Sequence, residues 1–148
     1  TVTWGGSTTL EQIGLKDKLH GANLEVVDRD NAANAGEKAE LMRKAFNCDY
    51  YLMSSNAITQ DGRLVNIDGN GNRVAALCYG PWNVIIIAGM NKVTADEECA
   101  RKRIRNYAAP MNNMRLDNGI LPVFFCPFTV GGMFFACPPH FGMKMSFH

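Results

Sequence analysis

The sequence SSNAITQDGRLVNIDGNGNRV, residues 54–74, decides how this chain folds. Asn, Asp, Gly, Ser and Thr dominate it, and these residues favour turns and local hydrogen bonds. Apolar and polar residues alternate on both sides of Asp61 and Gly62, which predicts a tight hairpin with a type I′ turn. The pattern becomes helical after Arg73. Because a glycine-rich loop that opens a helix presents free backbone N–H groups, the stretch also predicts an anion site.

Arg73 falls in the first turn of that predicted helix, where the helix dipole disfavours a cation. Two explanations are open: Asp68 neutralises the guanidinium, or a bound anion does. The alternative for the whole stretch is that it forms only a well-capped hairpin and turn. Two specialised turns in succession are more than a connecting segment needs, which favours a site.

Strand and helix patterns alternate on both sides of this stretch. A strand is expected at residues 2–4, and Thr8 with Glu11 forms a capping-box pattern for a helix that runs to about His20. Further strands are expected at residues 24–28, 49–53 and 84–88, and further helices at residues 37–47, 74–79 and 94–109. Residues 84–88 are uninterruptedly apolar, as in a strand buried on both faces. The sequence therefore predicts an α/β fold with an open, mostly parallel sheet, flanking helices and an added β-hairpin.

Ligands of such sheets bind beyond the carboxyl ends of the strands. Four polar loops follow predicted strands, at residues 5–9, 54–59, 68–73 and 89–92, and several should converge on one edge. In the first loop, Gly5 and Gly6 allow close backbone approach, and hydroxyls and amides there can bind a carboxylate or phosphate. In the last loop, Lys92 can neutralise such an anion; the alternative is a surface lysine at a helix start.

Other sequence features limit the chemistry and the cellular location that we expect for this protein. There is no visible catalytic triad, Walker P-loop or Rossmann glycine motif, so catalytic residues stay unknown and enzymatic activity is left open. The five cysteines lack the spacing of a zinc or iron–sulfur site, so we expect no metal and a reducing cytoplasm. Cys48, Cys78 and Cys99 are expected in the core. The net charge of +1 points to neither nucleic acid nor membrane as a partner, and Arg101, Lys102, Arg103 and Arg105 suggest a solvated helix face.

The last thirty residues differ from the rest. Residues 118–148 contain one charged residue, Lys144, and seven of the eight phenylalanines. No period of a helix or strand persists among the repeated Pro and Gly, and four prolines between residues 120 and 139 argue against a membrane-spanning helix. We therefore expect an α/β domain at residues 1–117 and an atypical apolar, Phe/Pro-rich tail at residues 118–148.

Several motifs together resemble the LUD (lactate utilization, LutC-like) family. They are TVTWGGSTTLEQIGL (residues 1–15), SSNAIT (54–59), LVNIDGNGNRVAA (64–76) and GMNK (89–92), and the resemblance ends at about Leu116. It implies a fold similar to the NagB/RpiA/CoA-transferase group, with a site at the strand ends. Family members usually carry a helical segment and a further strand ahead of the Gly5-Gly6 loop, which this chain is expected to lack.

The resemblance implies a role in or beside L-lactate oxidation, with a small carboxylate or phosphorylated metabolite as ligand. Iron–sulfur clusters would then reside in partner oxidoreductase subunits, with no cofactor in this chain. Two alternatives stay open: a non-catalytic binding or assembly module for an iron–sulfur oxidoreductase complex, and a phosphosugar or CoA-ester enzyme by fold analogy. Oligomerisation is also open. The candidate ligand-binding residues are Gly5, Gly6, Ser7, Thr9, Ser55, Asn56, Thr59, Asp68, Gly69, Gly71, Asn72, Arg73, Asn91 and Lys92.

Overall fold

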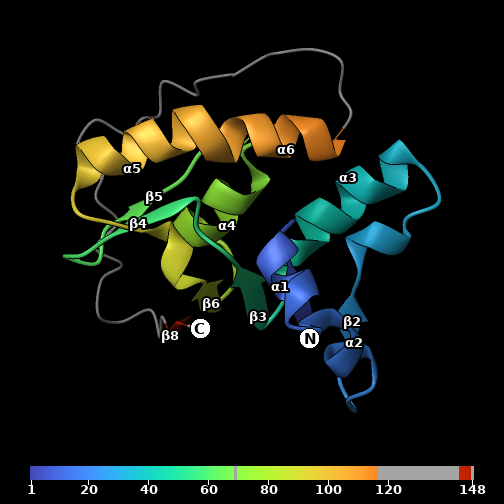
Figure 1. Ribbon diagram of the computed structural model, residues 1–148. Coiled ribbons are helices and arrows are strands. Elements are labelled where there is room, and N and C mark those ends of the chain that lie inside the picture. Colours follow the sequence, from blue (N-terminus) through green and yellow to red (C-terminus); the bar gives the residue numbers. More distant parts are fainter. Residues whose placement is uncertain (69, 117–143, 148) are drawn as a thin grey trace.

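The computed structural model describes residues 1–68, 70–116 and 144–147. Its main sheet has five strands in the order β2-β1-β3-β6-β8, and every neighbouring pair is parallel. These strands are β1 (Val2–Trp4), β2 (Val26–Val27), β3 (Tyr50–Met53), β6 (Asn83–Ala88) and β8 (Lys144–Phe147). The predicted α/β class with a mostly parallel sheet is confirmed (Figure 1).

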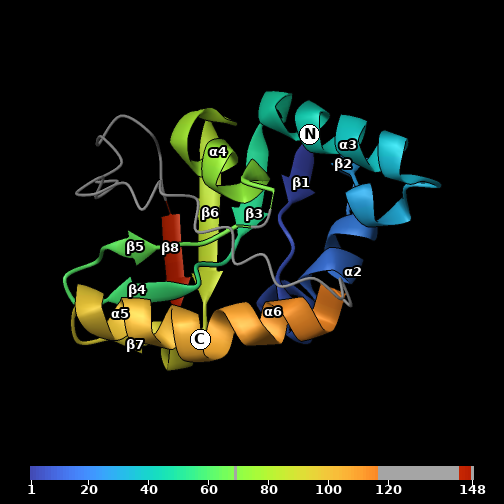
Figure 2. The ribbon, with the colours of Figure 1, turned by 90° about the horizontal axis from the view of Figure 1, so that it is seen from above.

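Alternating side chains give the central strands two apolar faces, as the period of a β-strand requires. On β3, Tyr51 and Met53 pack on one face against α4 (Asn72–Tyr79) and the 3-10 turn Ala45–Asn47. Leu52 points to the opposite face, where it joins α1 (Thr8–Gln12) and α2 (Leu15–His20). The core therefore lies in two layers, one on each side of the sheet. Helix α3 (Ala35–Lys44) completes the layer that contains α4 (Figure 2).

A second sheet carries the predicted hairpin. Strands β4 (Ala57–Thr59) and β5 (Leu64–Val65) pair antiparallel, and β7 (Val93–Thr94) joins β4 in parallel. Helix α5 (Glu97–Arg103) packs on this sheet through Ala100, and Ile104 extends the contact. A π-helical segment, Ile104–Ala108, joins α5 to α6 (Ala109–Leu116). Figure 2 shows α5 and α6 as one continuous rod across the carboxyl ends of the main strands.

The predicted hairpin exists, but its predicted turn type is wrong. A type I′ turn on Asp61 and Gly62 would place the turn hydrogen bond between residues 60 and 63. Instead, the N–H of Gly62 donates to the carbonyl of Thr59, and Thr59 pairs with Arg63. Gly62 then follows the turn with a φ of 87°, the left-handed position of a three-residue loop.

The helix predicted from residue 8 to His20 is two helices, because the chain breaks at Gly14. That glycine has a φ of 62°, a left-handed conformation that ends α1 and starts α2 in a new direction. The capping residue was also predicted wrongly. Ser7, not Thr8, accepts the hydrogen bond from the Leu10 N–H.

The helix predicted to end before Pro110 instead continues to Leu116, so that prediction is wrong. Within the π-helical segment, the N–H of Ala109 reaches back five residues to the carbonyl of Ile104. Proline lacks an N–H and crowds the preceding turn of a regular helix, and the wider π turn carries the chain past it. The cap of α5 is also different: Asp96, not Thr94, accepts from the Cys99 N–H.

Smaller differences concern element ends and burial. The strand predicted at residues 24–28 is limited to Val26–Val27, and Leu24 is exposed. Of the cysteines expected in the core, Cys48 is buried, whereas Cys78 and Cys99 are exposed. No helix within the described ranges combines the length and apolarity that crossing a bilayer requires.

The domain boundary predicted at residue 117 stays a prediction. Residues 117–143, which make up most of the predicted tail, lie outside the described residues. Residues Lys144–Phe147 form β8, which pairs with β6 from Ile85 to Ala88 at the edge of the main sheet.

The contact of α5 with the second sheet can be tested at Ile104, which is 5% exposed. Ile104→Ala should lower the free energy of unfolding by about 2–4 kcal/mol, because it removes buried methylenes and leaves a cavity. Urea denaturation measures this loss. Met114→Ala on α6 is the control, since Met114 is 76% exposed and its truncation should change little. Equal effects of the two substitutions would contradict this packing.

Candidate functional site

Three loops at the carboxyl edge of the main sheet meet at Lys92. This residue ends a 3-10 turn, Met90–Lys92, directly after β6. Its Nζ donates to the Oγ of Ser54, which follows β3, at 2.6 Å. It also donates to the Oγ1 of Thr9 in α1, which follows the glycine loop after β1, at 2.9 Å. The predicted convergence of loops on one edge is therefore present around this amine.

The surroundings of Lys92 are cationic. Within the described part of the chain, no carboxylate forms an ion pair with its Nζ. Burial, together with the nearby charges of Arg73 and Arg103, lowers the pKa of Lys92 to about 8. An ammonium without a counter-ion beside two arginines attracts anions, and a pKa near 8 leaves part of the lysine as a free amine at neutral pH.

Arg73 is buried, and its guanidinium connects several segments of the chain through hydrogen bonds instead of standing free to bind an anion. Its Nε donates to Asp68 Oδ1 at 2.8 Å, and its Nη1 donates to the carbonyl of Ser54 at 2.7 Å. Its Nη2 donates to Asn56 Oδ1 at 2.6 Å and to the carbonyl of Ile67 at 3.0 Å. Of the two explanations open for this arginine, the structure shows neutralisation by Asp68.

Asp68 has a second task at the start of α4. Its Oδ2 accepts a hydrogen bond from the N–H of Val74 at 2.7 Å, which satisfies one of the free donors in the first helical turn. The same carboxylate therefore caps the helix and neutralises Arg73. Without it, the positive end of the helix dipole and the positive charge of Arg73 would lie together with no negative charge to compensate them.

Gly5 makes room for Arg73. A Cβ on Gly5 would lie 2.8 Å from the Oη of Tyr51 and 3.3 Å from the side-chain carbons of Arg73. Tyr51 itself is fully buried on β3, and burial raises its pKa to about 12. This glycine was predicted to allow the close approach of a ligand, whereas the groups that approach it are the Tyr51 hydroxyl and the side-chain carbons of Arg73.

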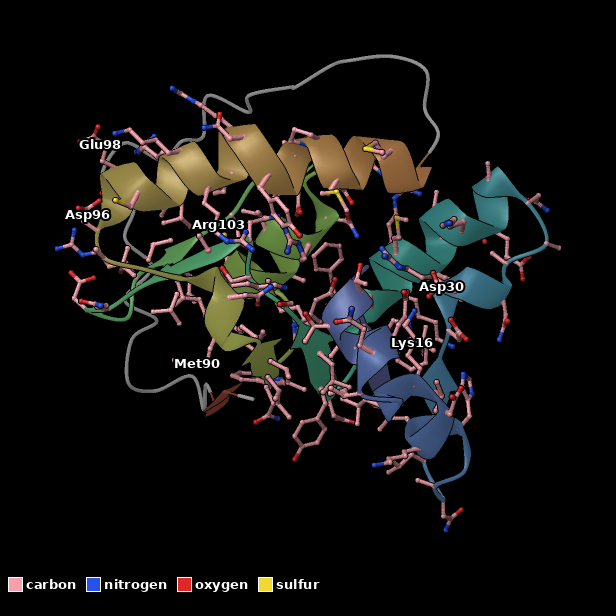
Figure 3. All side chains as sticks on the ribbon, in the orientation of Figure 1. Lys16, Asp30, Met90, Asp96, Glu98 and Arg103 are labelled. Carbon is pink, nitrogen blue, oxygen red and sulfur yellow. The ribbon has the colours of Figure 1, made fainter. Side chains whose placement is uncertain are left out.

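Arg103 is the residue that sequence reasoning placed wrongly. It was expected on a solvated face, but it is half-buried and reaches from α5 toward the strand ends, as Figure 3 shows. Its Nη1 donates to the carbonyl of Asn56 at 2.6 Å, and its Nε donates to the carbonyl of Asn91 at 3.1 Å. The signal was available: Arg103 lies three residues after Ala100 and next to Ile104, both on the predicted apolar face.

A cavity of about 670 Å³ lies beside this site. Gly6, Asn56, Asp68, Asn72 and Arg73 form part of its wall, and Lys92 does not. The other side of the cavity carries Lys16, Arg29, Asp30 and Lys38. Figure 3 shows Lys16 beside Asp30, and their ion pair measures 2.8 Å.

The other predicted residues cap helices or form hydrogen bonds within turns. Ser7 caps α1. The Oγ of Ser55 donates to the carbonyl of Ala57 at 2.7 Å, and Thr59 Oγ1 accepts from the N–H of Arg63 in the hairpin turn. Gly71 lies at the cap of α4. Gly69 lies outside the described residues.

Thirteen of the fourteen candidates lie within the described residues, and they divide into nine at the sheet edge and four in caps and turns, Gly71 among the four. The residues that it brings together at the sheet edge are Gly5, Gly6, Thr9, Asn56, Asp68, Asn72, Arg73, Asn91 and Lys92. Ser54, Tyr51 and Arg103 join this set, although they were not among the candidates. Ser7, Ser55 and Thr59 hold caps and turns. In residues 1–68, 70–116 and 144–147, no three His, Cys, Asp or Glu side chains cluster as metal ligands would.

Comparison with known proteins agrees with this architecture. The family model of the LUD domain matches residues 1–119. The chain belongs to the LUD domain family. LUD domains are associated with proteins of lactate utilization. No curated protein and no solved structure matches this LUD domain. The predicted resemblance, which ended at about Leu116, is confirmed over nearly the same range.

The role of Arg73 as a connector predicts a large loss of stability on its removal. Arg73→Ala should lower the free energy of unfolding by about 3 kcal/mol, because it leaves the half-buried Asp68 and several carbonyls without their donor. Lys102→Ala is the control, since its ion pair with Glu98 is exposed and should contribute less than about 1 kcal/mol. Urea denaturation of both variants measures the difference, and similar values would show that Arg73 is not a connector.

The pKa of Lys92 predicts a second stability effect with a defined pH dependence. Its folded-state pKa of about 8 lies below its ordinary value of 10.5, so the unfolded chain binds more protons between these pH values. Stability should therefore rise from about pH 8 toward pH 10.5. Lys92→Met should remove this rise and stabilise the protein at pH 7 by about 1 kcal/mol, after allowance for solvent screening. Thermal melts of both proteins from pH 7 to 10 measure it, and a parallel pH dependence would contradict the lowered pKa.

Proposed function

We propose that this LUD domain binds a small carboxylate or phosphorylated metabolite at the carboxyl edge of its sheet. It would do so as a component of, or an accessory to, L-lactate oxidation, in the cytoplasm. The observation that carries the proposal is the environment of Lys92. Hydroxyls from α1 and from the loop after β3 accept from this amine, two arginines lie near it, and no carboxylate among the described residues pairs with it.

The donors available around Lys92 suit a carboxylate or phosphate. An ammonium has three N–H donors, and Thr9 and Ser54 accept from two of them. Arg103 uses its Nε and Nη1 on carbonyls, and no described residue accepts from its Nη2. Arg73 adds positive potential, and four of its hydrogen bonds go to protein groups. An anion placed between Lys92 and Arg103 would complete these unused donors and meet charge-assisted hydrogen bonds.

A second candidate function, an assembly module for an iron–sulfur oxidoreductase complex, is favoured by a different observation. Tyr79, at the end of α4, is 88% exposed, and Trp82, just before β6, is 78% exposed. Large exposed aromatic side chains are enriched at protein–protein interfaces. They lie at the amino end of β6, whereas Lys92 follows its carboxyl end, so both functions can coexist in one domain.

Calorimetric titration tests the proposed binding. L-lactate, pyruvate and inorganic phosphate are titrated separately into the wild type, and at least one of them should bind. Lys92→Ala should weaken that binding by about 1.5–3 kcal/mol, the range for hydrogen bonds to charged groups, which is roughly a tenfold loss or more.

Lys102→Ala is the matched control, because Lys102 is an exposed lysine on the outer face of α5 and its loss should leave affinity unchanged. Failure of all three acids to bind the wild type would contradict the proposal. Equal affinities of the wild type and Lys92→Ala would show that the ligand does not contact this lysine. Turnover of L-lactate with an artificial electron acceptor, with and without iron–sulfur partner proteins, separates the catalytic from the accessory role.

A further inference from the structure

We propose that Lys92 is a nucleophile that captures the carbonyl group of a 2-oxo acid, such as pyruvate, as a reversible imine. The inference rests on the proposed function, because it names the substrate class of the same anion site. It goes further in giving the amine a covalent role. The geometry that carries it is the way two hydroxyls from different loops hold the Nζ of Lys92 while a guanidinium with unused donors lies nearby.

The hydrogen bonds of Lys92 suit a neutral amine. A neutral amine has two N–H donors and one lone pair. The Oγ1 of Thr9 and the Oγ of Ser54 lie 2.9 Å and 2.6 Å from the Nζ and can accept one N–H each. With both N–H groups held in this way, the lone pair is directed away from the two hydroxyls. No described group other than these two hydroxyls makes a hydrogen bond to the Nζ, so the lone pair is free to attack a carbonyl carbon.

The charges around Lys92 favour its reactive form. A lysine becomes nucleophilic when burial or a neighbouring cation disfavours its ammonium. Both causes act here, since burial and the charges of Arg73 and Arg103 together lower the pKa of Lys92 to about 8. A lysine paired with a carboxylate would instead hold its proton, as Lys16 does beside Asp30.

A 2-oxo acid matches the two kinds of group at this edge. Its carbonyl carbon is adjacent to a carboxylate, so a receptor for it needs an amine and a cationic donor side by side. Arg103 supplies the donor, because its Nη2 has no acceptor among the described residues. Arg103 also keeps its position through bonds to the carbonyls of Asn56 and Asn91, so its guanidinium is held in place before the ligand binds.

The reaction balances without an oxidant or reductant. The lone pair of Nζ forms a C–N bond to the carbonyl carbon, and the carbonyl oxygen receives a proton from the nitrogen, which gives a carbinolamine. The C–OH bond then breaks, and the hydroxyl leaves as water with the second amine proton. The product is a C=N bond, which hydrolysis reverses. The hydroxyls of Thr9 and Ser54 are placed to move these protons, since both contact Nζ.

Reductive trapping of the full chain tests the inference. The protein is incubated with pyruvate and sodium cyanoborohydride, which reduces an imine to a stable amine, and the adduct is located by peptide mapping with mass spectrometry. The adduct should accumulate on Lys92 at least about tenfold faster than on the exposed Lys102, because the lowered pKa of Lys92 gives it a larger free-amine fraction at neutral pH than an ordinary lysine has. L-lactate has no carbonyl group and should give no adduct, while an excess of it should slow trapping by pyruvate.

Two variants test whether Lys92 carries the adduct. Lys92→Arg cannot form an imine and should lose the adduct, whereas Lys102→Arg should retain it, and thermal melts establish that both are folded. Adducts spread evenly over exposed lysines would overturn the inference. If calorimetry shows that the wild type binds pyruvate while trapping leaves Lys92 unmodified, the covalent role fails and the proposed anion site stands. If neither binding nor trapping occurs, both proposals fail together.

Discussion

The buried guanidinium of Arg73 is the interaction on which the rest of the site depends. Its hydrogen bonds join the loop after β3 to the loop after β5 and the first turn of α4, which follow it by more than ten residues in the sequence. Ser54 occupies the centre of this arrangement, because its carbonyl accepts from Arg73 while its hydroxyl accepts from Lys92. The position of the candidate nucleophile is therefore fixed indirectly by an arginine whose hydrogen bonds go to protein groups.

The two cations of the site, Arg73 and Lys92, have opposite electrostatic environments. Arg73 is buried with a carboxylate beside it and each of its guanidinium nitrogens hydrogen-bonded, which offsets the cost of removing a charge from water. Lys92 is partly buried with hydroxyl partners and cationic neighbours, an arrangement that opposes its charge. A fold gains no stability from such a lysine, and groups with perturbed pKa values of this kind concentrate where proteins bind ligands or perform chemistry.

Local patterns predicted most of the fold, and the failures have physical reasons. The apolar run of β6 and the glycine loop before α4 are local signals, and both elements form where the sequence places them. The turn at Gly62 and the break at Gly14 depend on one residue's backbone angle, which composition does not specify. Arg103 was misplaced because its charge was given more weight than its position beside the apolar residues Ala100 and Ile104. Its partners, backbone carbonyls more than ten residues away, cannot be identified from the sequence.

The pattern of glycines and polar loops alone does not distinguish Arg73 from Lys92 in role. Each follows a glycine in a polar loop after a strand, so both satisfy the same pattern for anion binding. What separates them is Asp68, five residues before Arg73, whose carboxylate both pairs with the guanidinium and caps Val74. No carboxylate lies at the corresponding distance before Lys92, where the chain is still the apolar strand β6. A cation that follows directly on a buried strand must find its partners in other loops, and around Lys92 the described residues provide hydroxyls and arginines instead of a counter-ion.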